Sequence, residues 1–320
     1  MIPTLRADLH VHSCHSSRSG TLRFLHSRDC YSRPADVYAT AKRRGMDLVA
    51  FTDHDSIGGA LELLNARPDL EDVIVGEEIS CTLPDGGIDV HLAAYGMTES
   101  LHDEVQRLRG NVLDVAARLR EAGVFFALNH LLHFYRGQIP LERYLRVLAA
   151  VPALEVRNGT MLERHNRLTE RLAFGRFAAV AGSDAHTLRR IGTTWTEAPG
   201  RTRDEFLDSV RAGRGVPGGA HGTAATVAGD AHGVVASYMA SLVTGRPHDV
   251  RSWRRAACLA FVAVSLPFQF MPIVVAARSK AGERRAVDAL MRTLDRDPKS
   301  AAPEDVEVVA HDRLAEELGA

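Results

Sequence analysis

The stretch Leu5-Arg6-Ala7-Asp8-Leu9-His10-Val11-His12 decides how the rest of this chain is interpreted. Apolar and polar residues alternate from Leu5 to Val11, which is the period-two pattern of a short β-strand. His10 and His12 are two positions apart, so on a strand both imidazoles leave by the same face. Imidazole is a ligand for divalent transition metals, and the pair is therefore a candidate metal site. Taken alone, the two residues could equally be ordinary surface or core histidines.

Composition sets broad limits on the class of protein. The 320 residues suffice for one barrel-sized domain with a tail, or for one large domain plus an appendage. Lys+Arg 39 against Asp+Glu 40 gives a formal charge of −1, so no global field favours nucleic acid or membrane. The four cysteines form no C-x-x-C pair, which favours a reducing compartment. Because the first strand pattern begins so near Met1, we expect no signal peptide and a cytoplasmic location.

Strand and helix patterns alternate along the first two thirds of the chain. Pro34 opens a helical pattern that stops at Gly45, and a long helix over 101–119 is predicted to end at Gly123. Seven strand patterns fall at 5–11, 47–52, 73–80, 88–95, 124–129, 153–156 and 177–181. Such alternation predicts βαβ units with parallel strands, hence a barrel-like α/β fold. An open doubly wound sheet is the alternative, but no Gly-rich phosphate loop follows the first strand.

The amino-acid composition changes near Pro217, where Gly and Ala become frequent, and the residues after it have helical patterns. We therefore divide the chain into a barrel domain, 1–215, and a C-terminal helical extension with a charged tail, 216–320. Residues 256–277 carry no charge over a length that would make a transmembrane candidate. Pro267, Gln269 and Pro272 interrupt this segment, so a kinked helical pair packed on protein is expected, with membrane contact as the alternative.

Potential metal ligands recur where the strand patterns end. They are His10, His12, His54, Glu78, His91, His130, Asp184 and His186. The carboxyl ends of parallel barrel strands converge on one face, so residues far apart in sequence would meet in one pocket.

Four motifs, in this order, carry a family resemblance: Asp8-Leu9-His10-Val11-His12, Thr52-Asp53-His54-Asp55, Gly76-Glu77-Glu78-Ile79-Ser80 and Gly182-Ser183-Asp184-Ala185-His186. With His91 and His130, they resemble the PHP (polymerase and histidinol phosphatase) superfamily over roughly residues 5–190. The resemblance implies a distorted seven-stranded (β/α)7 TIM-like barrel with two or three divalent metals (Mn, Zn or Fe) at its C-terminal mouth. It also implies a metal-dependent phosphoesterase that hydrolyses phosphomonoesters or nucleotide phosphodiesters with a metal-activated hydroxide.

The resemblance also implies which residues hold each ion. One metal would be held by His10, His12, Glu78 and Asp184. A second would be held by Glu78, His91 and His130, which makes Glu78 a bridge between two ions. A third would be held by Asp29, His54 and His186. Mixed nitrogen and oxygen ligands of this kind suit Mn, Zn and Fe without strict selection, and two close metals activate a shared water.

Asp29 is the position where this chain departs from the family pattern. The family usually supplies an Asp a few residues after His-x-His, where this sequence has Ser17, Arg18 and Ser19. The family Asp also lies about five residues before the proline that opens the first helix, and Asp29 stands in that relation to Pro34. We therefore interpret 13–28 as an insertion and assign Asp29 as a ligand. The alternative is a surface acid.

Further residues are candidates for catalysis and substrate binding. His15 and His133 could donate a proton to the leaving group. Arg136, Arg189 and Arg190 follow ligand-bearing strands and could bind phosphate, and Arg18 makes the inserted loop basic. Asp53 could orient His54 or a neighbour, or cap a helix. Glu155 and Asn158 could line the pocket or pack beside it.

Two other functions are consistent with the same residues. A metal-dependent amide, carbamate or ester hydrolase would use the same barrel, because hydroxide attack does not require phosphorus. In the other alternative the barrel binds metal without catalysis, and a membrane-associated C-terminal region carries the function. For the phosphoesterase, the expected partner is a small anionic phosphorylated substrate, with nucleotides and oligonucleotides included.

Overall fold

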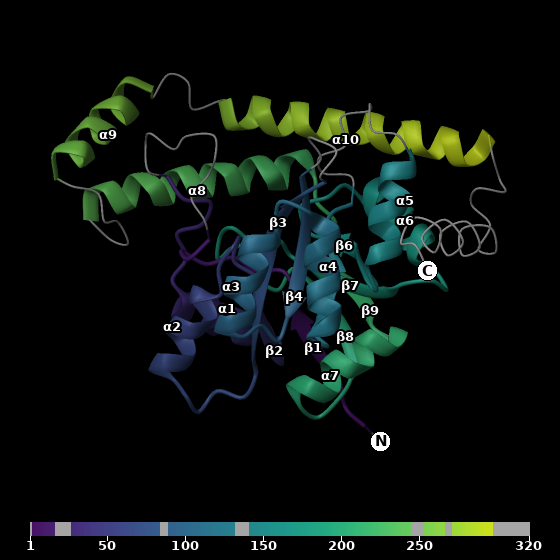
Figure 1. Cartoon of the computed structure of the whole chain (residues 1–320). Helices are drawn as coiled ribbons and strands as arrows, with labels where there is room; N and C mark the ends of the chain where they lie inside the picture. The colour runs from purple at the N-terminus through teal and green to yellow at the C-terminus, as the bar shows by residue number, and fades with distance from the viewer. Residues whose placement is uncertain are drawn as a thin grey trace.

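The computed structural model describes residues 2–16, 27–83, 89–131, 141–244, 252–265 and 271–296. Its described strands form one sheet in the order β7-β6-β5-β4-β3-β2-β1-β8-β9 (Figure 1). Their bounds are β1 Thr4–Asp8, β2 Leu48–Phe51, β3 Val73–Thr82, β4 Asp89–Tyr95, β5 Phe125–Leu128, β6 Ala153–Asn158, β7 Ala178–Gly182, β8 Thr194–Pro199 and β9 Val216–Gly219. Several strands, such as β2 and β5, are buried along their whole length, as expected for strands covered on both faces.

The two sides of this sheet approach each other, so that it curls into a nearly closed barrel. The backbone N–H of Ala181 in β7 donates to Thr196 Oγ1 in β8 over 2.7 Å. The same hydroxyl donates back to the Ala181 carbonyl over 3.0 Å. Beyond β1, an isolated parallel bridge joins Val11 to Ala185. The barrel-like α/β architecture predicted from the sequence is therefore present.

The strand count and the strand directions differ from the prediction. Within the described ranges the sheet has nine strands, not seven, and β4 is antiparallel to both β3 and β5. Only residues 83–88 separate β3 from β4, which is too short for the crossover that a parallel pair requires. The strand β9 was missed because it reads Val-Pro-Gly-Gly, a sequence typical of a turn. The strand β8 was missed although its six residues make it longer than β2 or β5.

Helices cover the outside of the sheet. Their bounds are α1 Pro34–Arg43, α2 Gly58–Ala66, α3 Glu99–Leu108, α4 Val112–Glu121, α5 Leu141–Ala150, α6 Glu163–Ala173 and α7 Arg203–Ser209, the last followed by a π-type turn at Val210–Arg214. Pro34 is the first residue of α1, as predicted, and Gly45 follows that helix with φ +78°. The predicted long helix over 101–119 is two helices, because the Asn111 side chain accepts a hydrogen bond from Leu113 N and caps a new start.

Small residues from several strands contribute to the interior of the barrel. They include Ala7, Ala50, Ala93, Ala127 and Ala153. Larger side chains such as Ile74, Phe125 and Tyr95 share this cluster, and the Tyr95 hydroxyl donates to the Leu9 carbonyl over 3.2 Å. This packed interior leaves the mouth, where β1, β2 and β3 end, as the place for polar side chains.

The C-terminal extension consists of α8 Ala224–Thr244, α9 Ser252–Ser265 and α10 Met271–Arg296. Figure 1 shows α8 and α10 side by side across one end of the barrel. Glu283 in α10 accepts a hydrogen bond from Leu162 N, at the start of α6, and forms a buried ion pair with Lys280. Across the ranges that the structure describes, no helix combines the length and apolar character needed to cross a membrane. The division of the chain at residue 215 stays a prediction.

Candidate metal centre

Glu78 of β3 lies at the centre of a ring of histidines at the mouth of the barrel. Five imidazole nitrogens lie within 3.3 Å of its carboxylate. Oε2 is 3.1 Å from His10 Nε2, 3.3 Å from His12 Nε2 and 3.2 Å from His54 Nδ1. Oε1 is 3.1 Å from His91 Nδ1 and 2.9 Å from His130 Nε2. Each carboxylate oxygen therefore faces its own set of imidazoles.

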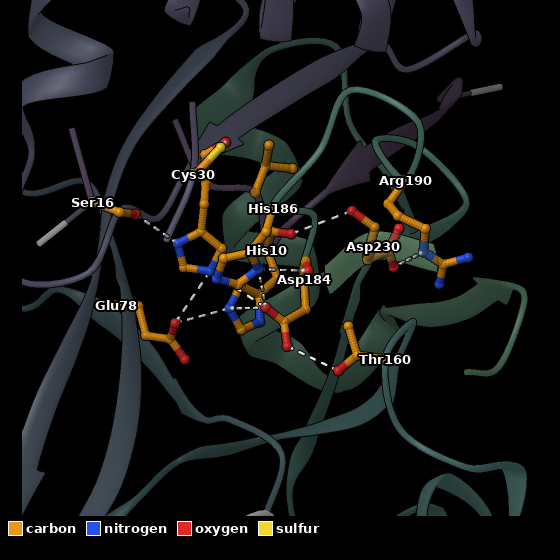
Figure 2. A network of polar contacts seen from close by, with 12 residues as sticks. His10, Ser16, Cys30, Glu78, Thr160, Asp184, His186, Arg190 and Asp230 are labelled. Atoms are coloured by element: carbon orange, nitrogen blue, oxygen red, sulfur yellow. Dashed lines mark hydrogen bonds and ion pairs between the residues drawn. The ribbon is translucent and has the colours of Figure 1, made fainter. Parts of the chain in front are cut away.

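Asp184, which follows β7, is the second carboxylate of the cluster (Figure 2). Its Oδ1 is 3.6 Å from His10 Nε2, 3.4 Å from His12 Nε2 and 3.5 Å from His186 Nδ1. The structure thus brings together all eight strand-end residues that the sequence singled out. They form four overlapping groups whose ligand atoms lie within 4.8 Å of one another: His10–His12–Asp184, His10–Glu78–His130, His54–Glu78–His91 and His12–His54–His186.

The segment that carries His10 and His12 is held from both sides. β1 ends at Asp8, earlier than predicted, and the next residues form a single bridge at Val11. The N–H of Thr52 donates to the Val11 carbonyl, and His12 N donates to Ala185 O. A Cβ at Gly182 would lie 2.3 Å from His10 Cβ, so only glycine permits this approach.

Local backbone geometry places the other ligands. An isolated parallel bridge sets His54 beside Glu78. His91 lies near the start of the reversed strand β4, in register with Ser80, and so reaches the mouth where β3 ends. His130 and Asp184 have φ of +26° and +52°, a region that non-glycine residues rarely adopt. Strained backbone of this kind is concentrated at functional sites.

A second layer of polar groups orients the histidines. His10 Nδ1 donates to Glu155 Oε1 over 2.8 Å, which turns Nε2 toward Glu78 and Asp184. His12 Nδ1 bonds Ser16 Oγ over 3.0 Å, and Ser16 in turn donates to Asp53. Partners of this kind fix the ring orientation of metal-ligating histidines. Asp53 therefore acts through Ser16 on His12, a neighbour of His54, which is one of the roles that the sequence left open.

Amide and hydroxyl donors also hold carboxylate oxygens of the cluster. Asn129 Nδ2 donates to Glu78 Oε1 over 2.9 Å. Asn158 Nδ2 donates to Glu155 Oε2 and Asp184 Oδ2, and Thr160 Oγ1 donates to Asp184 Oδ2 over 3.0 Å. Glu155 and Asn158 thus line the centre. Sequence reasoning missed Asn129 and Thr160, although Asn129 directly precedes a predicted ligand.

Burial and neighbouring charges shift the pKa values of the clustered carboxylates and imidazoles. Burial opposes ionisation of Glu78, but His10, His54 and His91 outweigh it and hold the pKa of Glu78 well below its usual range. Burial lowers the pKa of His12, but the neighbouring carboxylates of Asp184 and Glu78 outweigh that effect and raise it to about 9. Burial lowers the pKa of His186 to about 4. In the metal-free protein some of these imidazoles therefore carry protons, which a bound metal would displace.

The residues present fit a divalent metal. His12 Nε2 and His54 Nδ1 are buried nitrogens that, in the structure as described, make no hydrogen bond of proper geometry. Both lie close to Glu78 Oε2, inside a cluster of imidazoles and carboxylates. A cation at such a position would satisfy both nitrogens and offset the charge of the carboxylates.

Asp29 lies beside this cluster but belongs to none of the four groups. Burial is the main cause that raises the pKa of Asp29 to about 6, with smaller opposing effects of His12 and His91. Its segment is fixed, because Cys14 N donates to Ser32 O. In the structure His54 and His186 group with His12 and not with Asp29, so the role of Asp29 stays a prediction.

The remaining candidates take several positions. His15 pairs with Glu62 of α2 over 2.7 Å, which is a contact outside the cluster. Arg190 is buried, and its guanidinium already forms an ion pair with Asp230 instead of facing solvent as a phosphate-binding group. Arg189 is exposed on the same loop. The other three candidates, Arg18, His133 and Arg136, lie outside the described residues.

Comparisons with known proteins were made by sequence and by structure. A family model described as PHP-associated matches residues 163–214. An uncharacterized protein of Methanocaldococcus jannaschii is 33% identical over 79 residues, which cover 24% of this chain and 46% of that protein. The match thus spans less than half of the relative's length.

Two solved structures are similar to this chain. A two-domain protein of Bacteroides vulgatus that contains a predicted PHP-like metal-dependent phosphoesterase is 18% identical with a TM-score of 0.49, covering 68% of this chain and 66% of that chain. A lesion-specific endonuclease of Pyrococcus furiosus is 16% identical with a TM-score of 0.44, covering 66% of this chain and 56% of that chain.

The ordered motifs and the PHP-associated match point in the same direction. The motifs supply the ligand cluster described above, and the matched residues 163–214 run from α6 through β7 and β8. This chain is therefore similar to PHP proteins in its motifs and over that segment.

Proposed function

We propose that this protein is a metal-dependent phosphoesterase that hydrolyses a phosphomonoester or a nucleotide phosphodiester. The observation that carries the proposal is the burial of Glu78 among five imidazoles, with Asp184 opposite it. Burying so many imidazole nitrogens and carboxylate oxygens in one place costs free energy unless bound cations offset the negative charge and bind the nitrogens.

The proposed ligand sets are those that the family resemblance implies. His10, His12, Glu78 and Asp184 would hold one ion, and Glu78, His91 and His130 a second. In the structure Glu78 groups with His10 and His130 and also with His54 and His91, so both sets draw on neighbouring side chains. His54 and His186 would contribute to a third, with Asp29 as its proposed carboxylate. When bound, Mn, Zn or Fe would lower the pKa of a water and offset the negative charge of a phosphate ester.

Side chains of the protein would prepare the site for this reaction. Glu155 and Ser16 bond the Nδ1 atoms of His10 and His12, so both rings present Nε2 to the centre. Arg189 is exposed beside the His186 loop and is the described arginine best placed to attract an anionic substrate. His133 remains the proposed proton donor, since His15 is paired with Glu62.

The proposal also includes a cytoplasmic location. The four cysteines all lie in the described part of the chain, where they are buried and form no disulfide, in keeping with a reducing compartment.

A substrate screen of the metal-reconstituted protein tests the function. Metal-free protein is loaded separately with Mn, Zn or Fe and assayed on phosphomonoesters, nucleotides and short oligonucleotides, beside carboxylic esters and amides. We expect metal-dependent release of product from phosphate esters, with the metal-free protein as control. Hydrolysis confined to carboxylic esters or amides would replace the proposal by the second enzyme class. Bound metal with no hydrolysis of any panel would favour a binding module.

A further inference from the structure

Helix α8 of the C-terminal extension places a single carboxylate next to the metal centre. Asp230 is the only Asp, Glu, Lys or Arg in Ala224–Thr244. Its Oδ2 is 3.2 Å from Arg190 Nε, and Thr187 Oγ1 donates to its Oδ1 over 3.4 Å. Figure 2 shows Asp230 and Arg190 beside Asp184 and His186. Burying a carboxylate on a helix with no other charged residue costs free energy unless the carboxylate is paired, so its partners on the barrel are what make this position stable.

The two partners of Asp230 both belong to the loop that carries metal ligands. Thr187 directly follows His186, and Arg190 lies four positions beyond it on the same loop. The side chains of Arg190 and Asp230 are 8% and 14% exposed, so solvent screens this ion pair little. Asp230 therefore holds the loop at two points close to His186.

Arg190 extends the connection to the next loop of the mouth. Its Nη2 donates to the Gly159 carbonyl, and Gly159 lies between Asn158 and Thr160. Both of these residues donate to Asp184 Oδ2. A continuous series of contacts thus runs from Asp230 through Arg190 to the residues that fix the Asp184 carboxylate.

The packing of α8 makes this connection close. A Cβ at Gly233, one turn beyond Asp230, would lie 3.0 Å from Thr187 Cγ2. Farther along, Tyr238 packs on Tyr31 with ring centroids 6.1 Å apart, and Tyr31 belongs to the segment that contains Asp29. The helix therefore touches two of the segments from which ligands are proposed.

We infer that Asp230 is a positioning residue of the metal centre, through which the C-terminal extension fixes Asp184 and His186. The inference rests on the proposed metal-dependent function. It makes α8 a component of the site and not an appendage, because the barrel alone supplies no carboxylate for Arg190 among its described contacts. Partners of ligating groups typically change metal affinity by about 10- to 100-fold when they are removed.

The test compares Asp230→Asn with a matched control, Asp288→Asn. Asp288 of α10 also pairs with a barrel arginine, Arg164 of α6, and its described contacts include no residue of a ligand-bearing loop. Full-length proteins are titrated with Co²⁺, and its visible absorption spectrum reports both affinity and ligand geometry. We expect Asp230→Asn to weaken the weakest Co²⁺ site by about 10- to 100-fold and to alter its spectrum, while Asp288→Asn changes neither.

Three further measurements separate positioning from general stability. Thermal unfolding of the metal-free proteins should show that both variants are folded at the temperature of the titration, with the larger loss for Asp230→Asn because its ion pair is buried and that of Asp288 is exposed. Arg190→Gln should weaken Co²⁺ binding to a similar degree, and its combination with Asp230→Asn should be non-additive, because the two side chains act as one unit. Asp230→Glu should restore part of the affinity. If Asp230→Asn does not fold, Thr187→Val removes the other contact from the barrel side.

The outcomes are distinct. Wild-type Co²⁺ affinity and spectrum in a folded Asp230→Asn protein would overturn the inference while leaving the metal centre in place. Equal weakening by Asp288→Asn would also overturn it, because the effect would then be one of stability. A wild-type protein that binds no Co²⁺ would refute the metal centre itself.

Discussion

Replacing Glu78 by glutamine removes the charge at the centre of the proposed site while keeping the shape of the side chain. Glu78 is 1% exposed and faces five imidazoles, so a bound cation pair would lose its main compensating charge. Removing one partner of a buried ionic interaction costs about 3–5 kcal/mol. At about 1.4 kcal/mol per factor of ten, metal affinity should fall about 10²- to 10⁴-fold. Hydrolysis of a phosphate ester at limiting metal should fall with it.

The neighbouring residue provides a matched control. Glu77 is also buried and also bonds a histidine, but it points to the other face of β3. It accepts hydrogen bonds from His102 Nδ1 over 2.9 Å and from Gln106 Nε2 over 2.7 Å. Glu77→Gln should therefore lower the free energy of unfolding without changing metal affinity or stoichiometry.

The assay combines calorimetric titration of the metal-free proteins with Mn²⁺, elemental analysis of bound metal, and initial rates on a phosphomonoester. Unfolding curves establish that both variants are folded. A Glu78→Gln protein that binds and hydrolyses like the wild type would refute the bridging role of Glu78. Loss of metal in Glu77→Gln as well would show that the effect comes from damage to β3.

Three other predictions follow from particular positions. Gly182→Ala should lower the free energy of unfolding, measured in urea, by about 1–3 kcal/mol and should weaken metal binding, because its Cβ would lie 2.3 Å from His10 Cβ. Gly110→Ala is the control and should change neither quantity, because nothing lies within 4 Å of a Cβ at that position. Asp29→Ala should lower the metal content by about one ion per chain, and an unchanged content by elemental analysis would leave a two-metal site. Burial lowers the pKa of His165 to about 4, so the unfolded chain takes up a proton that the native protein excludes as pH falls from 6.5 toward 4. The metal-free wild type should therefore lose free energy of unfolding between pH 7 and pH 4.5, and His165→Gln should reduce that loss by up to about 3 kcal/mol. Urea titrations at the two pH values measure the loss, and an equal loss in both proteins would contradict this prediction.

The ligands could be predicted because most of them lie at or just beyond a short apolar strand pattern that is readable locally. His10, His54 and Asp184 all stand just beyond such a pattern, and strand ends of one sheet meet at its mouth. His91 was predicted for the right place with the wrong strand direction. It lies near the start of an antiparallel strand, and the short connection after Thr82 was the signal for that reversal.

The supporting residues were harder to predict because their roles depend on contacts between distant segments. Glu155 is one acid in an otherwise ordinary strand, and only its pairing with His10 gives it a function. Asp230 lies in a helical stretch with no strand pattern, and its partners come from the β7 loop. No local periodicity reports such contacts, since packing of the extension on the barrel creates them.

The central claim is that the cluster around Glu78 binds the metals used for phosphate ester hydrolysis. Anomalous diffraction from crystals of the Mn-loaded protein tests it most directly. We predict two or three anomalous peaks, each about 2 Å from imidazole nitrogens or carboxylate oxygens of the cluster, with Glu78 touching two of them. Peaks located away from His10, Glu78 and Asp184, or no peak at this mouth in protein that carries Mn, would contradict the account.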